Sequence, residues 1–288
     1  MHSDVAASAP EFSLIVTTKG RVVELAKLLQ SLERQLPESF EVILSDQNED
    51  DRLLPLLDCH RERLQIVHVR SEGGASRGRN AGLARARGRL IAFPDDDCWY
   101  PDGLLAKVRG LFEAHPEWDM MCGRSLGDDM RPTQGRWVAE PTPVCRSNAL
   151  QMSIEYTMFC RAPAVAAAGG FDETLGVGAG TRWGAGEGTD FLLSALGSGS
   201  AIMYTPDIQV HHPEKFADYS RPSRDRQSGY ARGIGYVLHK HKFSLAEAFS
   251  TIIRPLGGAV LFLARGQTAR SLYHLRVFAS RSLGWCGR

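Results

Sequence analysis

Short apolar runs alternate with helix-like segments along the first part of the chain. Runs of this length predict buried strands, and they cover residues 12–18, 40–46, 65–70 and 89–93. Between them, apolar side chains recur near the helical period, which predicts helices in residues 21–35, 53–64, 76–87 and 102–115. Strands that alternate with helices predict an α/β fold with a mainly parallel sheet covered by helices on both faces.

Polar side chains follow three of the predicted strands. Thr17 and Thr18 end the first strand, Asp46 ends the second, and residues 95–97, all aspartates, follow the fourth. In open sheets of this kind, ligands bind beyond the carboxyl ends of the strands. The sequence therefore predicts one binding site to which all these positions contribute.

The three consecutive aspartates raise an electrostatic question, because adjacent carboxylates repel each other. Carboxylates that lie close together suit a hard divalent cation such as Mg²⁺ or Mn²⁺. Asp95 and Asp97 flank one residue and can reach the same ion, whereas Asp96 need not contact it. The alternative is a solvated turn that caps the next helix.

The charge distribution divides the chain into two parts. Of its 288 residues, 43% are hydrophobic, which fits one large α/β domain with or without an appendage. The net charge is only +1, but residues 221–288 contain 12 Lys or Arg and 2 Asp or Glu, so this segment carries +10 and the remainder −9. We expect the basic segment to be helical and to meet an anionic partner, either nucleic acid or an acidic membrane surface.

Other features favour a cytoplasmic protein. The six cysteines are scattered without a CxxC pair, as is typical of reduced thiols and not of a zinc site or a disulfide framework. The N-terminal segment lacks the basic start and the apolar core of a signal peptide. The best apolar stretch, residues 256–264, is too short to span a bilayer. We expect a cytoplasmic location, with the basic segment lying at the inner face of the cell membrane.

Residues 73–102 read GGASRGRNAGLARARGRLIAFPDDDCWYPD and closely resemble the donor-binding core of family-2 glycosyltransferases of the GT-A fold. In that family a glycine-rich turn leads into an Arg-Asn-x-Gly helix, a strand, an Asp-x-Asp motif and a proline. The matching residues here are Gly73, Gly74, Arg79, Asn80, Gly82, Asp95, Asp97 and Pro101.

The resemblance covers residues 12–216 and implies a GT-A fold, with a Rossmann-like, mainly parallel sheet flanked by helices. Residues 1–216 would form the catalytic domain, with a donor half at about 12–120 and an acceptor half at about 121–216. Residues 217–288 would form a basic helical C-terminal region.

The resemblance also assigns donor-binding roles. Thr17 and Thr18 would line the nucleoside pocket, and Asp46 would accept a hydrogen bond from N3–H of uracil or thymine. Asp97 would ligate the metal directly, with Asp95 touching the ribose or the ion. The remaining donor-binding residues would be Arg79, Asn80 and Asp96. Alternatively, Asp46 caps a turn, Arg79 is a solvated helix residue and Asn80 caps its helix.

Residues 182–196, RWGAGEGTDFLLSAL, resemble the family's acceptor-side motif, in which Trp-Gly-x-Gly-Glu is followed by a second acid. Gly188 replaces that acid here, so Glu187 and Asp190 are the candidates for a base that deprotonates the acceptor hydroxyl. Glu187 is favoured, because Asp190 lies inside the first helical turn, where the helix dipole lowers its pKa. Both acids could instead only stabilise the helix start, and Trp183 could stack on an acceptor sugar or fill the core.

The stretch DIQVHHP, residues 207–213, resembles the place where family members carry a histidine that completes the metal or diphosphate site. His212, just before Pro213, matches that position better than His211. Neighbouring residues on a strand point to opposite faces, so only one of the two should reach the site. The alternative is an ordinary surface histidine.

The resemblance implies an inverting, metal-dependent glycosyltransferase of the hexosyl- or deoxyhexosyltransferase class. It would move a sugar from a UDP or dTDP sugar to an acceptor hydroxyl, on a saccharide or a lipid-linked acceptor, in bacterial surface polysaccharide or glycolipid synthesis. One alternative is a nucleotidyltransferase acting on a sugar phosphate, although only TTKGR follows the first strand where such enzymes carry a glycine-rich loop. The other is an RNA-binding module, for which no aromatic-basic signature is present.

Overall fold

The computed structural model of the chain describes residues 9–135, 137–152, 154–214 and 220–288. Its first part alternates strands and helices: β1 (Phe12–Thr18), α1 (Val23–Glu33), β2 (Phe40–Asp46), α2 (Leu54–His60), β3 (Gln65–Arg70), α3 (Ala75–Leu83), β4 (Leu90–Ala92) and α4 (Leu104–Ala114). The first three predicted strands are confirmed to the residue. The fourth is shorter than predicted by one residue at each end. The predicted helices are confirmed, each shorter than predicted, and α3 begins one residue earlier.

The second part is less regular, as its sequence indicates. Its elements are β5 (Met120–Leu126), β6 (Pro132–Thr133), β7 (Thr142–Pro143), α5 (Ala149–Met152), the 3₁₀ helix η1 (Glu155–Thr157), β8 (Met158–Arg161), α6 (Ala162–Ala168), α7 (Glu187–Gly197), β9 (Ile202–His211), α8 (Arg221–Lys240), α9 (Leu245–Ala264) and α10 (Thr268–Trp285).

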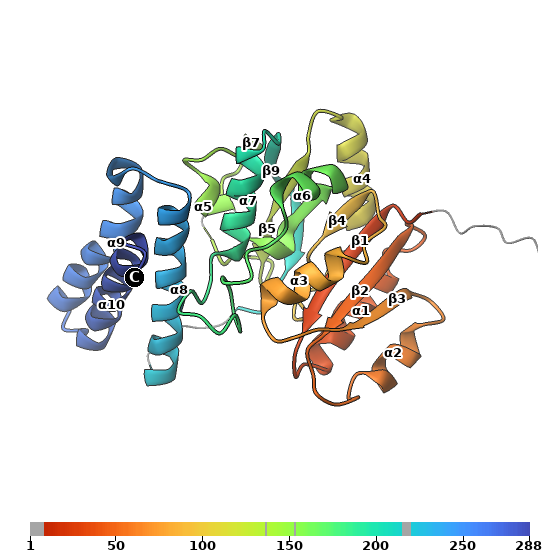
Figure 1. Cartoon of the computed structure of the whole chain (residues 1–288), viewed down its shortest axis with the longest axis horizontal. Helices are drawn as coiled ribbons and strands as arrows, with labels where there is room; N and C mark the ends of the chain where they lie inside the picture. The colour runs from red at the N-terminus through yellow and green to blue at the C-terminus, as the bar shows by residue number, and fades with distance from the viewer. Residues whose placement is uncertain (1–8, 136, 153, 215–219) are drawn as a thin grey trace, which may run out of the picture. The chain divides into compact units, whose positions relative to one another are not determined.

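The strands form one mixed sheet in the order β3-β2-β1-β4-β8-β5-β9-β7, with β6 paired to β5 (Figure 1). The pairs β3–β2, β2–β1, β1–β4 and β5–β9 are parallel, whereas β8 runs antiparallel to both β4 and β5. The α/β fold with a mainly parallel sheet is thus confirmed. The antiparallel strand β8 in the middle of the sheet was not predicted.

Strand β1 shows how the two faces of the sheet are covered. Leu14 and Val16 belong to the core that includes the apolar residues of α1 and α4. The alternate residues of the strand face α3, where a Cβ on Gly82 would lie 2.3 Å from a methyl carbon of Ile15. Because side chains alternate along a strand, one apolar run can bury both faces.

The chain order of the strands places the switch point of the sheet between β1 and β4. From β1 the chain builds β2 and β3 on one side and then returns to build β4 on the other side. Loops after neighbouring strands diverge at such a point, which leaves room for a ligand at the carboxyl edge. Thr18 ends β1 there, and the three aspartates follow β4.

The chain divides into two compact units. The sheet unit comprises the chain up to Glu72, Gly78–Gly170 and Ala195–Glu214, and the helical unit comprises Gly73–Arg77, Phe171–Ser194 and the segment that carries α8, α9 and α10. These units follow spatial contacts and assign no function, so the predicted division at residue 216 stays a prediction.

The helices expected in the basic C-terminal segment are present. A Cβ on Gly235 of α8 would lie 2.1 Å from the carbonyl oxygen of Arg281 in α10, and one on Gly284 of α10 would lie 2.1 Å from that of Arg232 in α8. The two helices therefore touch backbone to backbone, which only glycine allows at these positions.

The sequence predicted that the longest apolar stretch is too short to span a bilayer, and this argument from length was wrong. Within the described residues, one helix, α9, is long and apolar enough to cross a membrane by length and composition alone. The sequence estimate counted only the uninterrupted apolar run of residues 256–264, whereas the helix begins eleven residues earlier and adds further apolar residues.

Replacing Gly82 by alanine tests the close packing of α3 on β1. The added methyl group would overlap Ile15, so we expect the free energy of unfolding to fall by about 1–3 kcal/mol, as in other overpacked cores.

Gly110 in α4 is the matched control for Gly82, because nothing lies within 4 Å of its Cβ position. Gly110→Ala should raise the free energy of unfolding by up to about 1 kcal/mol, since alanine favours helix more than glycine does. Urea unfolding measures both variants, and stabilisation by both would contradict the packing of α3.

Candidate active site

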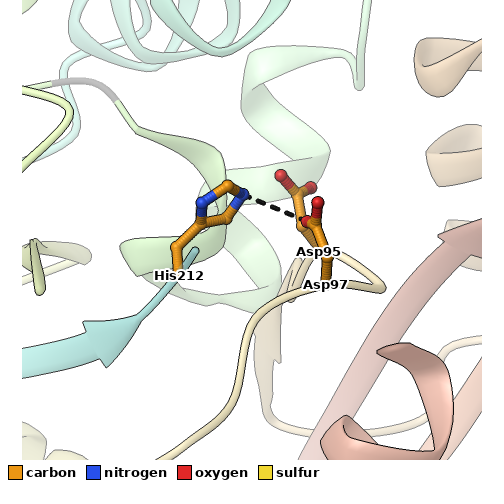
Figure 2. A group of neighbouring side chains, drawn as sticks. All are labelled: Asp95, Asp97 and His212. Carbon is orange, nitrogen blue, oxygen red and sulfur yellow. Dashed lines mark ion pairs between the residues drawn. The ribbon is translucent and has the colours of Figure 1, made fainter. Parts of the chain in front are cut away.

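Asp95, Asp97 and His212 converge at the carboxyl edge of the sheet, and Figure 2 shows the imidazole directed at the Asp97 carboxylate. One ligand atom from each lies within 4.8 Å of the others, and His212 Nε2 is 3.0 Å from Asp97 Oδ1. The loop after β4 is fixed to the end of β9, because Trp99 and His211 exchange two backbone hydrogen bonds of 3.0 Å. This pairing sets His212 opposite Asp97.

The neighbouring histidine has a different environment, as expected for adjacent residues on a strand. The ring of His211 stacks on Trp99 with centroids 5.1 Å apart, whereas the ring of His212 stacks on Tyr156 at 4.8 Å. Of the two, only His212 contributes to the group with Asp95 and Asp97.

Cations from separate elements neutralise the three aspartates. Arg21, in the loop after β1, reaches Asp97 at 2.8 Å and also pairs with Asp96. Arg79, on α3, lies 3.1 Å from Asp95. The expected role of Arg79 near the donor is compatible with this contact. Arg21 was missed in the sequence, where TTKGR was noted only as a loop without a glycine-rich signature.

Burial and charge shift the protonation of two groups in this cluster. Burial raises the pKa of Asp96 to about 6, with Asp95 adding to the shift while Thr18 and Arg21 oppose it. Burial alone would lower the pKa of His212, but its hydrogen bond to Asp97 and the charges of Asp97 and Asp95 raise the pKa overall. The acidic surroundings of His212 together therefore outweigh the cost of burying a charged imidazole.

The residues present fit a divalent cation. Two carboxylates and one imidazole supply oxygen and nitrogen donors that already converge on one point. Carboxylate oxygens suit Mg²⁺ and Mn²⁺, and an imidazole is a ligand for transition metals more than for Mg²⁺. The set is thus compatible with Mn²⁺ and, through its carboxylates, with Mg²⁺.

Asp46 lies at the end of β2 and is wholly buried. Its Oδ1 accepts hydrogen bonds from the backbone and side chain of Asn48 at 2.9 and 2.8 Å. Its Oδ2 lies 2.9 Å from His68 Nε2 and 3.1 Å from Arg70. Both oxygens are engaged, so contact with a nucleobase requires one of these donors to move. Its role in base recognition stays a prediction.

Thr17 at the end of β1 and Asn80 on α3 have different surroundings. Among the described residues, the buried Thr17 hydroxyl has no hydrogen-bond partner, and a buried polar atom of this kind marks a place where water or a ligand can bind. Asn80 lines a cavity of about 530 Å³ together with Leu83 and residues of α6. That cavity does not include the aspartates, so the donor-binding role of Asn80 stays a prediction.

The acceptor-side residues lie in the helical unit. Helix α7 begins at Glu187, so Glu187 and Asp190 both lie in its first turn. Glu187 is buried, and its carboxyl carbon would lie 2.8 Å from a Cβ on Gly176, which has φ of +100°. The helix dipole therefore acts on both acids. The sequence argument, which favoured Glu187 because only Asp190 was expected in the first turn, does not hold.

Asp190 is held by the C-terminal end of α8. Its Oδ2 accepts a hydrogen bond of 2.8 Å from Lys240 Nζ, and its Oδ1 lies 2.7 Å from His241 Nε2. Lys240 also donates to Asp172 at 2.7 Å. Neither Lys240 nor His241 was named from the sequence, because they lie about fifty residues beyond Asp190 and no local pattern connects them.

Helix α8 also packs closely on the acceptor-side motif. The Trp183 ring stacks on Tyr236 of α8 with centroids 4.4 Å apart, and a Cβ on Gly233 would lie 2.0 Å from the carbonyl oxygen of Ala185. One face of Trp183 is thus already covered by protein. The packing alternative for this residue is supported, and sugar stacking stays a prediction.

The sheet order with its switch point between β1 and β4, and the Asp-Asp-His group at the carboxyl edge, define an α/β protein of the GT-A type. The chain belongs to glycosyl transferase family 2, whose profile matches residues 13–163. Residues 1–349 of S. aureus TarS, solved in complex with UDP-GlcNAc, superpose with a TM-score of 0.58 at 19% identity over 95% of this chain and 92% of the TarS fragment.

Two other proteins extend the comparison. The mannosyltransferase PcManGT from Pyrobaculum calidifontis, in complex with GDP-Man and Mn²⁺, has a TM-score of 0.60 at 14% identity over 96% of this chain and 88% of that chain. A "PGL/p-HBAD biosynthesis glycosyltransferase" of Mycobacterium bovis is 31% identical over 135 residues, which is 45% of this chain and 51% of the relative. The match thus spans about half the length of that relative. The GT-A fold implied by the resemblance is confirmed.

Replacing Lys240 by methionine tests the ion-pair network behind α7. The variant leaves Asp172 and the nearly buried Asp190 without their ammonium partner. We expect the free energy of unfolding at neutral pH to fall by about 2–3 kcal/mol, which is less than for a fully buried pair because a third of the lysine side chain is exposed. The exposed Lys242, changed to methionine, is the control and should have little effect.

The loss of stability in Lys240→Met should depend on pH, and the direction of this dependence follows from the pKa of Asp172. Burial alone would raise the pKa of Asp172, but hydrogen bonds from Lys240 and Thr174 lower it overall. A carboxylate with a lowered pKa stabilises the fold above its unfolded-state pKa, and that stabilisation is lost as the pH falls through the folded value. Urea unfolding should show the difference between wild type and Lys240→Met shrinking below about pH 4. A difference that grows with acidification would contradict the network.

Proposed function

We propose that this chain is an inverting, metal-dependent glycosyltransferase that uses a nucleoside diphosphate sugar. The observation that carries the proposal is the convergence of Asp95, Asp97 and His212 at the carboxyl edge of a GT-A sheet, in a member of glycosyl transferase family 2. The named complexes of TarS with UDP-GlcNAc and of PcManGT with GDP-Man and Mn²⁺ support a nucleotide-sugar donor and a divalent metal.

The donor would be a UDP or dTDP sugar, of the hexosyl or deoxyhexosyl class. This part of the proposal rests on Asp46 at the end of β2, whose carboxylate can accept a hydrogen bond from N3–H of uracil or thymine. The two structural neighbours carry different bases, so they do not favour one. The acceptor would be a hydroxyl of a saccharide or lipid-linked molecule in bacterial surface polysaccharide or glycolipid synthesis.

Asp95, Asp97 and His212 would hold Mg²⁺ or Mn²⁺. When bound, such an ion supplies positive charge that stabilises the departing diphosphate. Arg21 and Arg79 add two guanidinium groups next to the same carboxylates. Guanidinium groups bind phosphate oxygens with two parallel N–H donors, so both arginines are suited to contact the diphosphate once they leave the aspartates.

Glu187 would act as the base in a single displacement. Its carboxylate takes the proton of the acceptor hydroxyl while the hydroxyl oxygen attacks the anomeric carbon. The bond between that carbon and the diphosphate oxygen breaks, the electron pair leaves with the nucleoside diphosphate, and the configuration inverts. Asp190 is the weaker candidate, because Lys240 and His241 already engage both of its oxygens.

The proposed activity is tested by calorimetric titration with nucleotides, followed by analysis of the released product. UDP or dTDP should bind at least tenfold more tightly than GDP, and turnover with a suitable acceptor should release a nucleoside diphosphate and stop in EDTA. A preference for GDP would overturn the assignment of Asp46. Release of pyrophosphate would identify a nucleotidyltransferase, and full turnover in EDTA would remove the metal from the mechanism.

Within the same assay, Asp97→Asn should abolish measurable Mn²⁺ binding and lower turnover at least hundredfold, because several kcal/mol of charge stabilisation are lost. Asp102→Asn is the matched control, since Asp102 lies in the same loop region but is exposed and pairs with Arg34. It should keep both properties. Retention of metal affinity in Asp97→Asn would contradict the ligand assignment.

The assignment of the base is tested by Glu187→Gln and Asp190→Asn. A positioned general base contributes roughly 10²- to 10⁴-fold in rate, so Glu187→Gln should lose about that factor in kcat while its affinity for the nucleotide is unchanged. Asp190→Asn should lower the thermal stability and reduce kcat by a smaller factor. If Asp190→Asn shows the larger loss of kcat at unchanged stability, the two roles are exchanged.

A further inference from the structure

Helix α9 exposes an apolar stripe along its whole length. Leu245, Phe249, Val260 and Leu263 are exposed, and the half-buried Ile253 and Leu256 lie between them. Steps of three or four residues place these six side chains on one face of the helix. The exposed fractions reach 69% for Val260 and 60% for Leu263. Contiguous exposed apolar surface of this kind marks an interaction site.

The face of α9 next to the stripe is occupied by protein, so the stripe is separate from the residues that pack the helix. Ala248, Ile252, Pro255 and Ala259 are buried along the neighbouring face. Ser271 of α10 donates a hydrogen bond of 2.8 Å to the carbonyl oxygen of Ala259. Helix α10 therefore covers the buried face and leaves the stripe exposed.

Helix α10 repeats the pattern with a shorter stripe. Leu272, Leu275 and Leu283 are exposed, and their spacing again places them on one helix face. The two helices thus carry apolar residues that their own hairpin does not bury.

The charges around these stripes are almost all positive. Between residues 245 and 288 the chain has 6 Arg and a single acid, Glu247. Arg254, Arg265 and Arg270 are exposed, and Arg265 and Arg270 flank the turn directly after the most exposed apolar residues. Apolar side chains bordered by arginines are the composition of helices that lie in the interface of an anionic membrane.

A flat position in the interface fits these helices better than a span. Arg281 of α10 donates a hydrogen bond of 2.7 Å to the carbonyl oxygen of Thr251 in the middle of α9. A spanning α9 would carry Arg276 and Arg281 of the attached α10 into the hydrocarbon, which is costly. Lying flat buries the apolar stripe and leaves the arginines at the level of the headgroups.

We propose that the α9–α10 hairpin binds the surface of an anionic lipid bilayer, with the stripe Leu245, Phe249, Val260 and Leu263 inserted and Arg254, Arg265 and Arg270 at the headgroups. The inference stands on the exposed residues of the helical unit and does not depend on the proposed transferase activity. Its occupant is a lipid surface and not a protein, because apolar and cationic residues are combined over a helix face with almost no acid.

Vesicle flotation of the full chain tests the proposal. Vesicles of phosphatidylcholine alone are compared with vesicles that also contain phosphatidylglycerol, at low and high salt. The triple variant Arg254→Gln, Arg265→Gln, Arg270→Gln removes charge and keeps the stripe. The triple variant Phe249→Asn, Val260→Asn, Leu263→Asn removes apolar surface and keeps the charge. Val23→Asn is the control, because Val23 is 80% exposed on α1, outside the helical unit.

We expect the wild type and Val23→Asn to float with anionic vesicles and to be released by salt. The arginine variant should lose about fivefold in partition coefficient for each charge, near hundredfold in all. The asparagine variant should lose at least tenfold. Circular dichroism and nucleotide titration confirm that each variant is folded.

Three results would overturn the proposal. The first is that the wild type fails to float with anionic vesicles. The second is that both triple variants float as well as the wild type. The third is self-association of the wild type, measured by light scattering and abolished in the asparagine variant, which would assign the stripe to a second copy of the chain.

Discussion

Three adjacent carboxylates can lie at the buried end of a strand only if positive charge is brought to them, and this requirement connects the distant parts of the sheet unit. Arg21 comes from the loop after β1, Arg79 from α3, and His212 from the end of β9. The backbone pairing of Trp99 with His211 fixes the last of these. The charge balance therefore depends on the strand order, since β1 and β4 must be neighbours and β9 must reach the same edge.

The elements were predictable where the sequence signal is local. The runs that became β1, β2 and β3 are mostly apolar and end at polar residues, so their bounds could be read directly. Strand β8 could not be found this way, because four residues between a 3₁₀ helix and α6 carry no periodicity of their own. Its place between β4 and β5 is decided by pairing partners that lie far away in the sequence.

The residues of the site were likewise predictable only in part. The aspartates were predictable because neighbouring carboxylates suit a hard cation, and the late histidine was predictable only from the resemblance to the family. The partners Arg21, Lys240 and His241 were not, since each is one of many basic residues until the fold sets it against a particular carboxylate. Asp190 illustrates the consequence. From its position alone it competes with Glu187 as a base, and only the approach of Lys240 and His241 shows that it joins α7 to α8.

Helix α8 makes two different backbone contacts, and a different set of glycines allows each of them. Gly229 and Gly233 of α8 let the acceptor-side motif approach the helix backbone, and Gly235 with Gly284 lets α10 pack on α8 from another side. With α8 covered in this way, the apolar residues of α9 that do not face α10 find no further protein within the helical unit. The net charge of the whole chain is near zero and does not reveal this arrangement. The negative charge of the first part nearly equals the positive charge of the basic segment in size, but the two lie in different parts of the chain. Local charge, and not the total, decides which surface of the molecule can meet an anionic bilayer.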